Sequence, residues 1–459
     1  MTDQAWPTPG QPFQRRFQDR RTPQQRDQDR DEVRRQVENL TRRRRDTRFR
    51  QELIRSLQDR RRGKNVVQFD ALHRGVEQFE TLLATGELLV RDADVGNQLV
   101  QELIQDGFAE RPVACLDNRV VRLVKPQIDI QELQARARTL RAAGAEASVN
   151  HITPLGPVAK GLGGPEPSSG GDLFPPDLET STAAVTIAIV DTGIDNTRRG
   201  DGWLVNVPRT TDNLDPLDIY PPAGFLDYGA GHGTFAAGVV QQVFPQADIR
   251  MYKALDSDGI GSEVAVACAM VRAVQEGADI LNLSLGVHES FEDLEPLAIK
   301  VALEIIAEIE AAERRQVLIA AAAGNYADAV RCWPAAFPPP VVAVAGLQAD
   351  LQPAAWSSRG DWVDCATIAE GILSTYVVGE ESAETDPTEP DKFLPPDPWA
   401  VWSGTSFAAP QIAAAVARIC QEENLRRRPR DAFEELRRRG GPPAGAGFGR
   451  FTVELLPGT

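Results

Sequence analysis

Apolar residues gather in short continuous runs over the C-terminal part of the chain, which is the pattern of buried parallel strands. The runs Thr186 to Val190 and Val317 to Ala320 are apolar or β-branched throughout. Stretches of small residues, such as Thr234 to Val240 and Phe407 to Ala417, suit helices that pack closely against a sheet. The pattern predicts an α/β fold, with a mostly parallel sheet and helices on both faces.

A different order of elements precedes this region. Between residues 87 and 152, apolar positions predict four strands, and the stretches Val95 to Asp106 and Ile128 to Ala143 predict helices. The predicted order is β-α-β-β-α-β, which is the split pattern of ferredoxin-like domains. We therefore expect a small ferredoxin-like α+β domain over residues 66–152. An unrelated α+β accessory domain is the alternative.

Arginine dominates the first 65 residues, which hold 19 Lys plus Arg against 10 Asp plus Glu, although the whole chain has a net charge of −16. From Asp31 to Arg62, apolar residues recur at helical spacing, so an Arg-rich N-terminal segment that is partly helical or disordered is expected over residues 1–65. This segment either docks on the acidic remainder of the chain or binds an anionic partner through Arg42 to Arg45. Few aromatic residues lie among the arginines, which disfavours nucleic acid as that partner.

Glycine, proline and serine are frequent between Thr153 and Thr182, so residues 153–182 are expected to form a linker. The large α/β domain would then cover residues 183–459. A chain of 459 residues is long enough for one large domain and smaller ones before it.

Composition bears on location and on redox chemistry. No apolar run approaches the roughly 18 residues that cross a bilayer, and the first thirty residues lack the apolar core of a signal peptide. We therefore expect a cytoplasmic protein with no membrane partner. Five cysteines, at positions 115, 268, 332, 365 and 420, form no C-x-x-C pair, and their number and spacing indicate neither a disulfide framework nor a zinc site.

Three motifs carry candidate chemistry. VDTGID, GHGTFAAG and SGTSFAAP supply Asp191, His232 and Ser406 in that order along the chain. A serine nucleophile needs a base that takes its proton and an acid that orients the base, and these residues offer one group for each role. The order differs from that of chymotrypsin-like enzymes, and the residues around Ser406 do not form the G-x-S-x-G elbow of α/β-hydrolases.

From about Ala184 to its C-terminus, the chain resembles the subtilisin-like serine proteases, the subtilases. Besides the three motifs, the segments Lys253 to Gly261, Asp279 to Gly286 and Ala321 to Asn325 are similar to family segments and follow in the family's order. The resemblance implies a subtilisin-like fold and serine endopeptidase activity on a polypeptide substrate. It implies catalytic roles for Asp191, His232, Ser406 and Asn325, and substrate-binding roles for Gly259, Ser284, Leu285, Gly286, Ala323 and Gly324.

One departure from the family concerns Phe235, which stands where the family usually has a second histidine and leaves the local packing open. The expected chemistry needs no cofactor. Subtilases commonly bind structural calcium, but the chain has no matching ligand motif, so no metal is assigned.

The resemblance also implies a role for the N-terminal half. Subtilases often carry a propeptide that assists folding and then blocks the active site with its C-terminal tail. A regulatory or inhibitory region is therefore expected, as in a zymogen, with its tail near His151 to Lys160 in the substrate cleft. One alternative is a sensor or recruitment module that a regulatory protein partner controls. Another is a pseudoprotease that only binds peptides, although the four catalytic residue types are all present.

Overall fold

The structure is a computed structural model that describes residues 21–42, 46–72, 80–155, 163–169, 185–288, 295–386, 390–422 and 428–459. Its largest sheet has seven strands in the order β10-β7-β11-β13-β15-β16-β21, and all neighbouring strands are parallel. The strands are β7 (Thr186–Asp191), β10 (Asp248–Lys253), β11 (Ile280–Leu283), β13 (Leu318–Ala322), β15 (Val341–Leu347), β16 (Cys365–Ile368) and β21 (Thr452–Val453).

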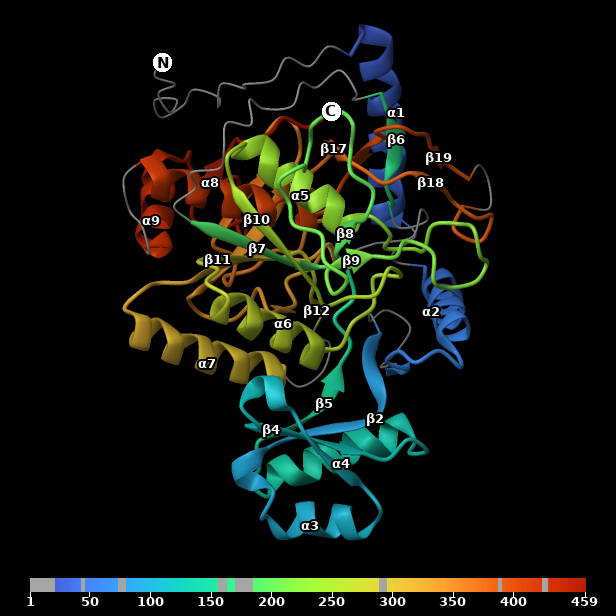
Figure 1. Ribbon diagram of the computed structural model, residues 1–459, viewed down its shortest axis with the longest axis vertical. Coiled ribbons are helices and arrows are strands. Elements are labelled where there is room, and N and C mark those ends of the chain that lie inside the picture. Colours follow the sequence, from blue (N-terminus) through green and yellow to red (C-terminus); the bar gives the residue numbers. More distant parts are fainter. Residues whose placement is uncertain are drawn as a thin grey trace.

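Helices cover both faces of this sheet (Figure 1). They are α5 (His232–Val243), α8 (Ala409–Glu422) and α9 (Pro429–Arg439) on one face, and α6 (Glu263–Gln275) and α7 (Leu297–Glu313) on the other. Strand β7 shows why two layers form: Ile187 and Ile189 belong to the core under α5 and α8, whereas Ala188 and Val190 belong to the core under α6 and α7. The predicted α/β fold with a mostly parallel sheet is confirmed.

Short strands outside the large sheet form separate small sheets. They are β8 (Ile194–Asp195) with β9 (Leu214–Asp215), β12 (Val287–His288) with β14 (Cys332–Trp333), β18 (Gly379–Glu380) with β19 (Lys392–Phe393), and a three-stranded sheet of β17 (Ile372–Thr375), β20 (Trp399–Trp402) and β6 (Glu166–Ser168). Strand β6 lies in the stretch expected to be a linker, where residues 156–162 and 170–182 are outside the described part. The stretch therefore contributes a strand to the sheet beside β20.

A second, five-stranded antiparallel sheet lies below α6 and α7 in Figure 1. Its elements are β1 (Phe69–Leu72), β2 (Thr81–Arg91), α3 (Gln98–Gln105), β3 (Ala109–Pro112), β4 (Val120–Val124), α4 (Ile130–Ala142) and β5 (Ala147–His151). Strand β2 pairs with β4 and β5, and β3 lies outside β4. Leu88 and Val90 of β2 pack under α3 and α4, whereas Leu89 between them packs with residues of α6 and α7.

Two helices precede this sheet and lie against the large domain (Figure 1). Helix α1 (Pro23–Arg42) reaches β20 and β6, where the side-chain amide of Gln36 donates to the carbonyl oxygens of Val401 (2.8 Å) and Gly164 (3.0 Å). Helix α2 (Thr47–Arg61) begins at Asp46, whose carboxylate caps it. Residues 1–20 and Arg43 to Arg45 of the Arg-rich segment are outside the described part. Among the described residues, no helix is long and apolar enough to cross a membrane.

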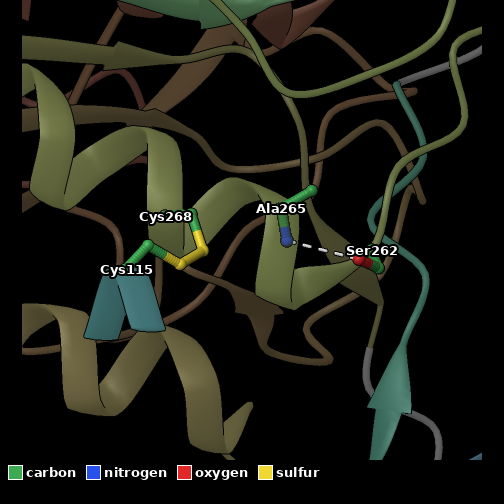
Figure 2. The surroundings of a disulfide bond; sticks show 4 residues. All are labelled: Cys115, Ser262, Ala265 and Cys268. Atoms are coloured by element: carbon green, nitrogen blue, oxygen red, sulfur yellow. Dashed lines mark hydrogen bonds between the residues drawn. A yellow bond between two sulfur atoms is a disulfide. The ribbon is translucent and has the colours of Figure 1, made fainter. Parts of the chain in front are cut away.

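A disulfide joins the N-terminal sheet to the large domain, although the number and spacing of the cysteines did not indicate one. Cys115 lies in the 3-10 turn η3 (Ala114–Leu116) between β3 and β4, and Cys268 lies in α6 (Figure 2). The two cysteines are 153 residues apart, and their Cα atoms are 5.3 Å apart. The expectation that no disulfide forms was wrong because the pair meets only where the N-terminal sheet docks on α6, and sequence spacing does not reveal that docking. Cys332, Cys365 and Cys420 are buried and form no disulfide within the described part of the chain.

Candidate active site

Asp191 and His232 meet at the carboxyl end of the large sheet. Asp191 is the last residue of β7 and His232 the first residue of α5, and both are buried. The Nδ1 atom of His232 lies 2.8 Å and 2.9 Å from the two carboxylate oxygens of Asp191. A carboxylate in this position holds the proton on Nδ1, which leaves Nε2 as the basic nitrogen of a neutral imidazole.

The chain enters α5 through a glycine that no other residue can replace without strain. Gly231 has a φ of +75°, and a Cβ atom there would lie 2.8 Å from the Val377 side chain and 3.0 Å from that of Tyr376. A larger residue at this position would shift His232, so Gly231 helps to keep the histidine in place.

Aromatic rings form the wall behind His232. The imidazole lies edge-on to Trp402, with 5.2 Å between ring centroids, and 5.3 Å from Phe407. Phe235 is fully buried and packs on Phe407 at 4.4 Å, so it supports the ring that contacts His232. The packing question raised by Phe235 is thereby answered, since an apolar ring fits this buried position.

Ser406 lies in the 3-10 turn η6 (Thr405–Phe407) that leads into α8. Its hydroxyl donates to the carbonyl oxygen of Ser284 (3.1 Å), and the Ser284 hydroxyl donates to the carbonyl oxygen of Ser406 (2.7 Å). No hydrogen bond joins the described side chains of Ser406 and His232 in this state. Catalytic hydrogen bonds are often long or absent in resting structures, so this arrangement is compatible with a nucleophile at rest.

Asn325 is oriented by Thr405, the residue before Ser406. Its side-chain oxygen accepts hydrogen bonds from the backbone nitrogen (2.8 Å) and hydroxyl (2.9 Å) of Thr405. These bonds fix which end of the amide is the acceptor and leave Nδ2 as the donor at the site. No motif in the sequence indicates that Thr405 orients Asn325.

Asn325 and Ser406 line one pocket with about 250 Å³ of space outside the protein atoms. Four of the predicted substrate-binding residues also line it: Ser284, Leu285, Gly286 and Gly324. Ala323 does not, because its side chain packs in a buried cluster behind the strand with Ala345 and Phe448. Ala322 lines the pocket in its place.

A segment from the N-terminal part of the chain lies in the cleft beside this pocket. The backbone nitrogens of Thr153 and Leu155 donate to the carbonyl oxygens of Gly261 (2.8 Å) and Gly259 (3.0 Å), and Gly286 donates to the carbonyl oxygen of Pro154 (3.2 Å). The segment therefore runs as an antiparallel strand between two edges of the large domain, and Gly259 contacts it through its backbone. Residues 156–160 of the expected tail are outside the described part.

A second buried carboxyl group lies near the histidine and was not predicted. Asp215 accepts hydrogen bonds from the Thr192 hydroxyl (2.8 Å) and the Gly231 nitrogen (2.9 Å), so it ties the segment after Asp191 to the segment before His232. Burial raises its pKa to about 6, despite the opposing attraction of Lys253.

No metal site is found in the described part of the chain, where no group of three or more His, Cys, Asp or Glu side chains could hold an ion. The residues around Asp191, His232 and Ser406 thus offer a nucleophile, a base, an orienting carboxylate and an amide donor, and no calcium ligand set is assigned.

Comparisons with known proteins agree with the resemblance to subtilases. Residues 182–435 match the family model of the subtilase family. Among curated proteins, the chain is 27% identical over 271 residues to the thermophilic serine proteinase of Bacillus sp. (strain AK1), which covers 56% of this chain and 58% of that protein. It is 28% identical over 260 residues to the intracellular serine protease of Paenibacillus polymyxa, which covers 54% of this chain and 69% of that protein.

Among solved structures, the fold is similar to that of fervidolysin from Fervidobacterium pennivorans, with a TM-score of 0.57 and 20% identity. The match covers 85% of this chain and 62% of fervidolysin. The chain thus spans less than two thirds of the length of both fervidolysin and the Bacillus proteinase.

Proposed function

The chain belongs to the subtilase family, and from this premise we propose that it is a serine endopeptidase whose N-terminal region holds the substrate cleft closed. The observation that carries the activity is the buried pair of Asp191 and His232 beside a pocket that Ser406 and Asn325 line. The substrate is a polypeptide, and no cofactor takes part in the chemistry.

In the proposed reaction, the Ser406 hydroxyl leaves the Ser284 carbonyl, gives its proton to Nε2 of His232 and attacks the substrate carbonyl. Asp191 stabilises the imidazolium that forms. Nδ2 of Asn325 and the backbone nitrogen of Ser406 donate to the oxyanion, where negative charge develops. His232 then protonates the leaving amine, and water repeats the sequence on the acyl-enzyme to release the product.

The segment Ile152 to Leu155 supports the proposed inhibition. Its three backbone hydrogen bonds to Gly259, Gly261 and Gly286 are those that an extended peptide would make on the two open edges of the cleft. Leu155 is also buried, in the same apolar cluster as Tyr228. While this segment is bound, a substrate strand has no free edge to pair with.

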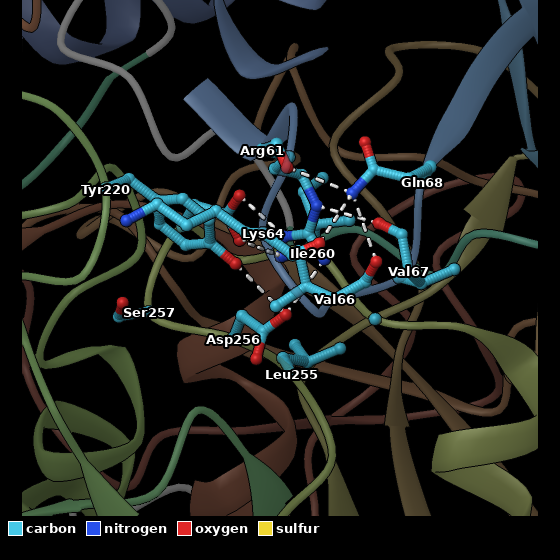
Figure 3. A network of polar contacts seen from close by, with 12 residues as sticks. Arg61, Lys64, Val66, Val67, Gln68, Tyr220, Leu255, Asp256, Ser257 and Ile260 are labelled. Atoms are coloured by element: carbon cyan, nitrogen blue, oxygen red, sulfur yellow. Dashed lines mark hydrogen bonds and ion pairs between the residues drawn. The ribbon is translucent and has the colours of Figure 1, made fainter. Parts of the chain in front are cut away.

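Helix α2 supports the same proposal from the outer side of the cleft. Arg61 is fully buried, and its guanidinium donates to both carboxylate oxygens of Asp258 (2.7 Å each) and to Asp256 (2.8 Å), as Figure 3 shows in part. Although burial opposes its charge, the Asp258 carboxylate raises the pKa of Arg61. Gly259 and Gly261 follow these aspartates directly, so α2 holds the loop that pairs with the tail.

The location of the protein and the binding partner of its Arg-rich segment are also proposals. The similarity to a protein named an intracellular serine protease supports a site of action inside the cell. The contacts of α2 with Asp256 and Asp258 favour docking of the Arg-rich segment within the chain over binding to an outside partner.

Hydrolysis of an unfolded protein tests the activity. The wild-type chain should release new amino termini from denatured casein, and Ser406→Ala should release none. Ser148→Ala is a matched control, because the Ser148 hydroxyl is buried in β5 and has no hydrogen-bond partner among the residues that the structure describes. Casein hydrolysis by Ser406→Ala at the wild-type rate would show that the nucleophile is misassigned.

Mass spectrometry under reducing conditions tests the role of the N-terminal region. If the tail is a processed inhibitor, wild-type protein should separate into two fragments cut between Leu155 and Val185, whereas Ser406→Ala should stay whole. A fully active wild-type protein with an uncut chain would count against obligatory self-processing.

A further inference from the structure

The disulfide between Cys115 and Cys268 lies where it can hold the N-terminal region on the large domain. It is a cross-link between the N-terminal sheet and helix α6 of the large domain. A cut between Leu155 and Val185 separates the two regions as polypeptides, but the disulfide still joins them covalently.

Helix α6 connects this disulfide directly to the cleft. Its N-cap residue, Ser262, pairs with Ile152 of the tail, and Gly261 before it accepts the hydrogen bond from Thr153. Figure 2 shows the cap and the disulfide on the same helix. Cys268 follows Ser262 by six residues, which is about 9 Å along the helix axis. The N-terminal region is therefore fixed to both the start and the middle of α6.

The disulfide is also within reach of a reductant. Cys115 is exposed and Cys268 is half-buried, whereas the thiols of Cys332, Cys365 and Cys420 are buried. Exposed disulfides exchange with thiols more readily than enclosed ones, because the attacking thiolate must approach a sulfur atom. Cys115 is the exposed residue of the pair, so we infer that a thiolate would approach from its side.

Noncovalent contacts also join the two regions. His151 of β5 forms a buried pair with Glu263 of α6 (3.0 Å), and Arg61 of α2 forms one with Asp258 (2.7 Å). The ion pairs of Arg91 with Glu304 and of Arg119 with Glu308 have partly exposed side chains, and pairs of this type contribute little. A larger apolar contact, which includes Leu89, Leu116 and Ile152, adds to them. A covalent link at such an interface keeps the released segment at a high effective concentration beside its binding site.

We propose that the Cys115–Cys268 disulfide is a thiol–disulfide exchange site through which a thiol reductant controls release of the tail from the cleft. This inference rests on the proposed function, since it describes the regulation of the same site. In an oxidising compartment the tail stays bound even after the chain is cut, whereas in a reducing compartment the N-terminal region can dissociate.

The exchange balances with a dithiol as the reductant. One thiolate of the dithiol attacks the sulfur of Cys115, a mixed disulfide forms, and Cys268 leaves as a thiolate that takes up a proton. The second thiol of the reductant then displaces Cys115. Two electrons pass to the protein, which gains two thiols, and the reductant leaves as its own disulfide.

Hydrogen exchange in the full Ser406→Ala chain tests the proposal without any catalysis. The readout is the exchange rate of the Thr153 and Leu155 amides, measured before and after treatment with dithiothreitol. Reduction should raise both rates by about tenfold or more, because the disulfide no longer holds the N-terminal sheet on α6. Cys115→Ser in the Ser406→Ala chain should exchange at the faster rate without dithiothreitol, and Cys420→Ser in the same chain, which removes a buried free thiol, should not.

Equal exchange rates in the oxidised and reduced chains would overturn the proposal. If Cys115→Ser fails to fold, reduction of the chain with its native cysteines makes the same comparison. Fluorophosphonate labelling of the wild-type chain then separates the two ideas. Exchange that depends on reduction, with no labelling in either state, supports the exchange site and counts against the proposed function. Labelling without any effect of reduction supports the function and overturns the exchange site.

Discussion

Replacing Arg61 by alanine removes the cation from a carboxylate that solvent does not reach. The side chains of Arg61 and Asp258 are both fully buried, and two hydrogen bonds of 2.7 Å join them. After the substitution, the described contacts leave Asp258 one hydrogen bond, from the backbone nitrogen of Ile260 (3.2 Å). Breaking a buried ion pair on one side costs about 3–5 kcal/mol, because the remaining charge stays buried without a partner.

We therefore expect Arg61→Ala to lower the free energy of unfolding by about 3–5 kcal/mol. Urea denaturation followed by tryptophan fluorescence measures this change. The next residue provides a matched control, since the Arg62 side chain is 79% exposed and pairs only with Asp59 among the described residues. Arg62→Ala should change the free energy by no more than about 0.5 kcal/mol.

A double-mutant cycle isolates the interaction. Arg61→Ala and Asp258→Ala together should cost less than the sum of the two single changes, by about 1–3 kcal/mol. Additive effects within about 0.5 kcal/mol, or an Arg61→Ala chain as stable as Arg62→Ala, would refute the claim that this pair anchors α2.

Three further predictions concern the active site and the N-terminal segment that lies in its cleft. Asn325→Ala should lower kcat by about 10² to 10³, the range known for loss of the corresponding donor in subtilisin, with little change in KM, and steady-state kinetics on a peptide amide measures it. Burial raises the pKa of Asp215 from 3.8 to about 6, so its stabilising effect is present below pH 4 and is lost as the pH rises through 6. The free energy of unfolding should fall by about 3 kcal/mol across that window because of this group, and urea titrations of Asp215→Asn should lack that part of the fall. Leu155→Asp places a charge at a buried position and should speed fluorophosphonate labelling, whereas Leu394→Asp, at a side chain that is 67% exposed, should not; equal rates would contradict the proposed cover.

Features that depend on residues close together in the chain could be predicted from the sequence. The apolar run of β7 and the glycines around His232 are short-range patterns, and the structure has a strand and a helix start at those places. The motif does not show whether Ala322 or Ala323 lines the pocket, because side chains alternate along a strand and the face that Ala322 takes depends on the fold.

Long-range features could not be predicted in the same way. The disulfide depends on how the N-terminal sheet docks on α6, and nothing near Cys115 in sequence specifies Cys268. Arg61 is one of many arginines in its segment, and only the buried surroundings of Asp258 distinguish it from Arg62. Such roles arise from tertiary packing.

Fluorophosphonate labelling with peptide mapping tests the central claim most directly. After reduction of the full chain, we expect one adduct, located on Ser406, and a large loss of its formation rate in His232→Ala. An adduct that persists in Ser406→Ala, or a labelling rate that is unchanged in His232→Ala, would contradict the assignment of these residues as nucleophile and base.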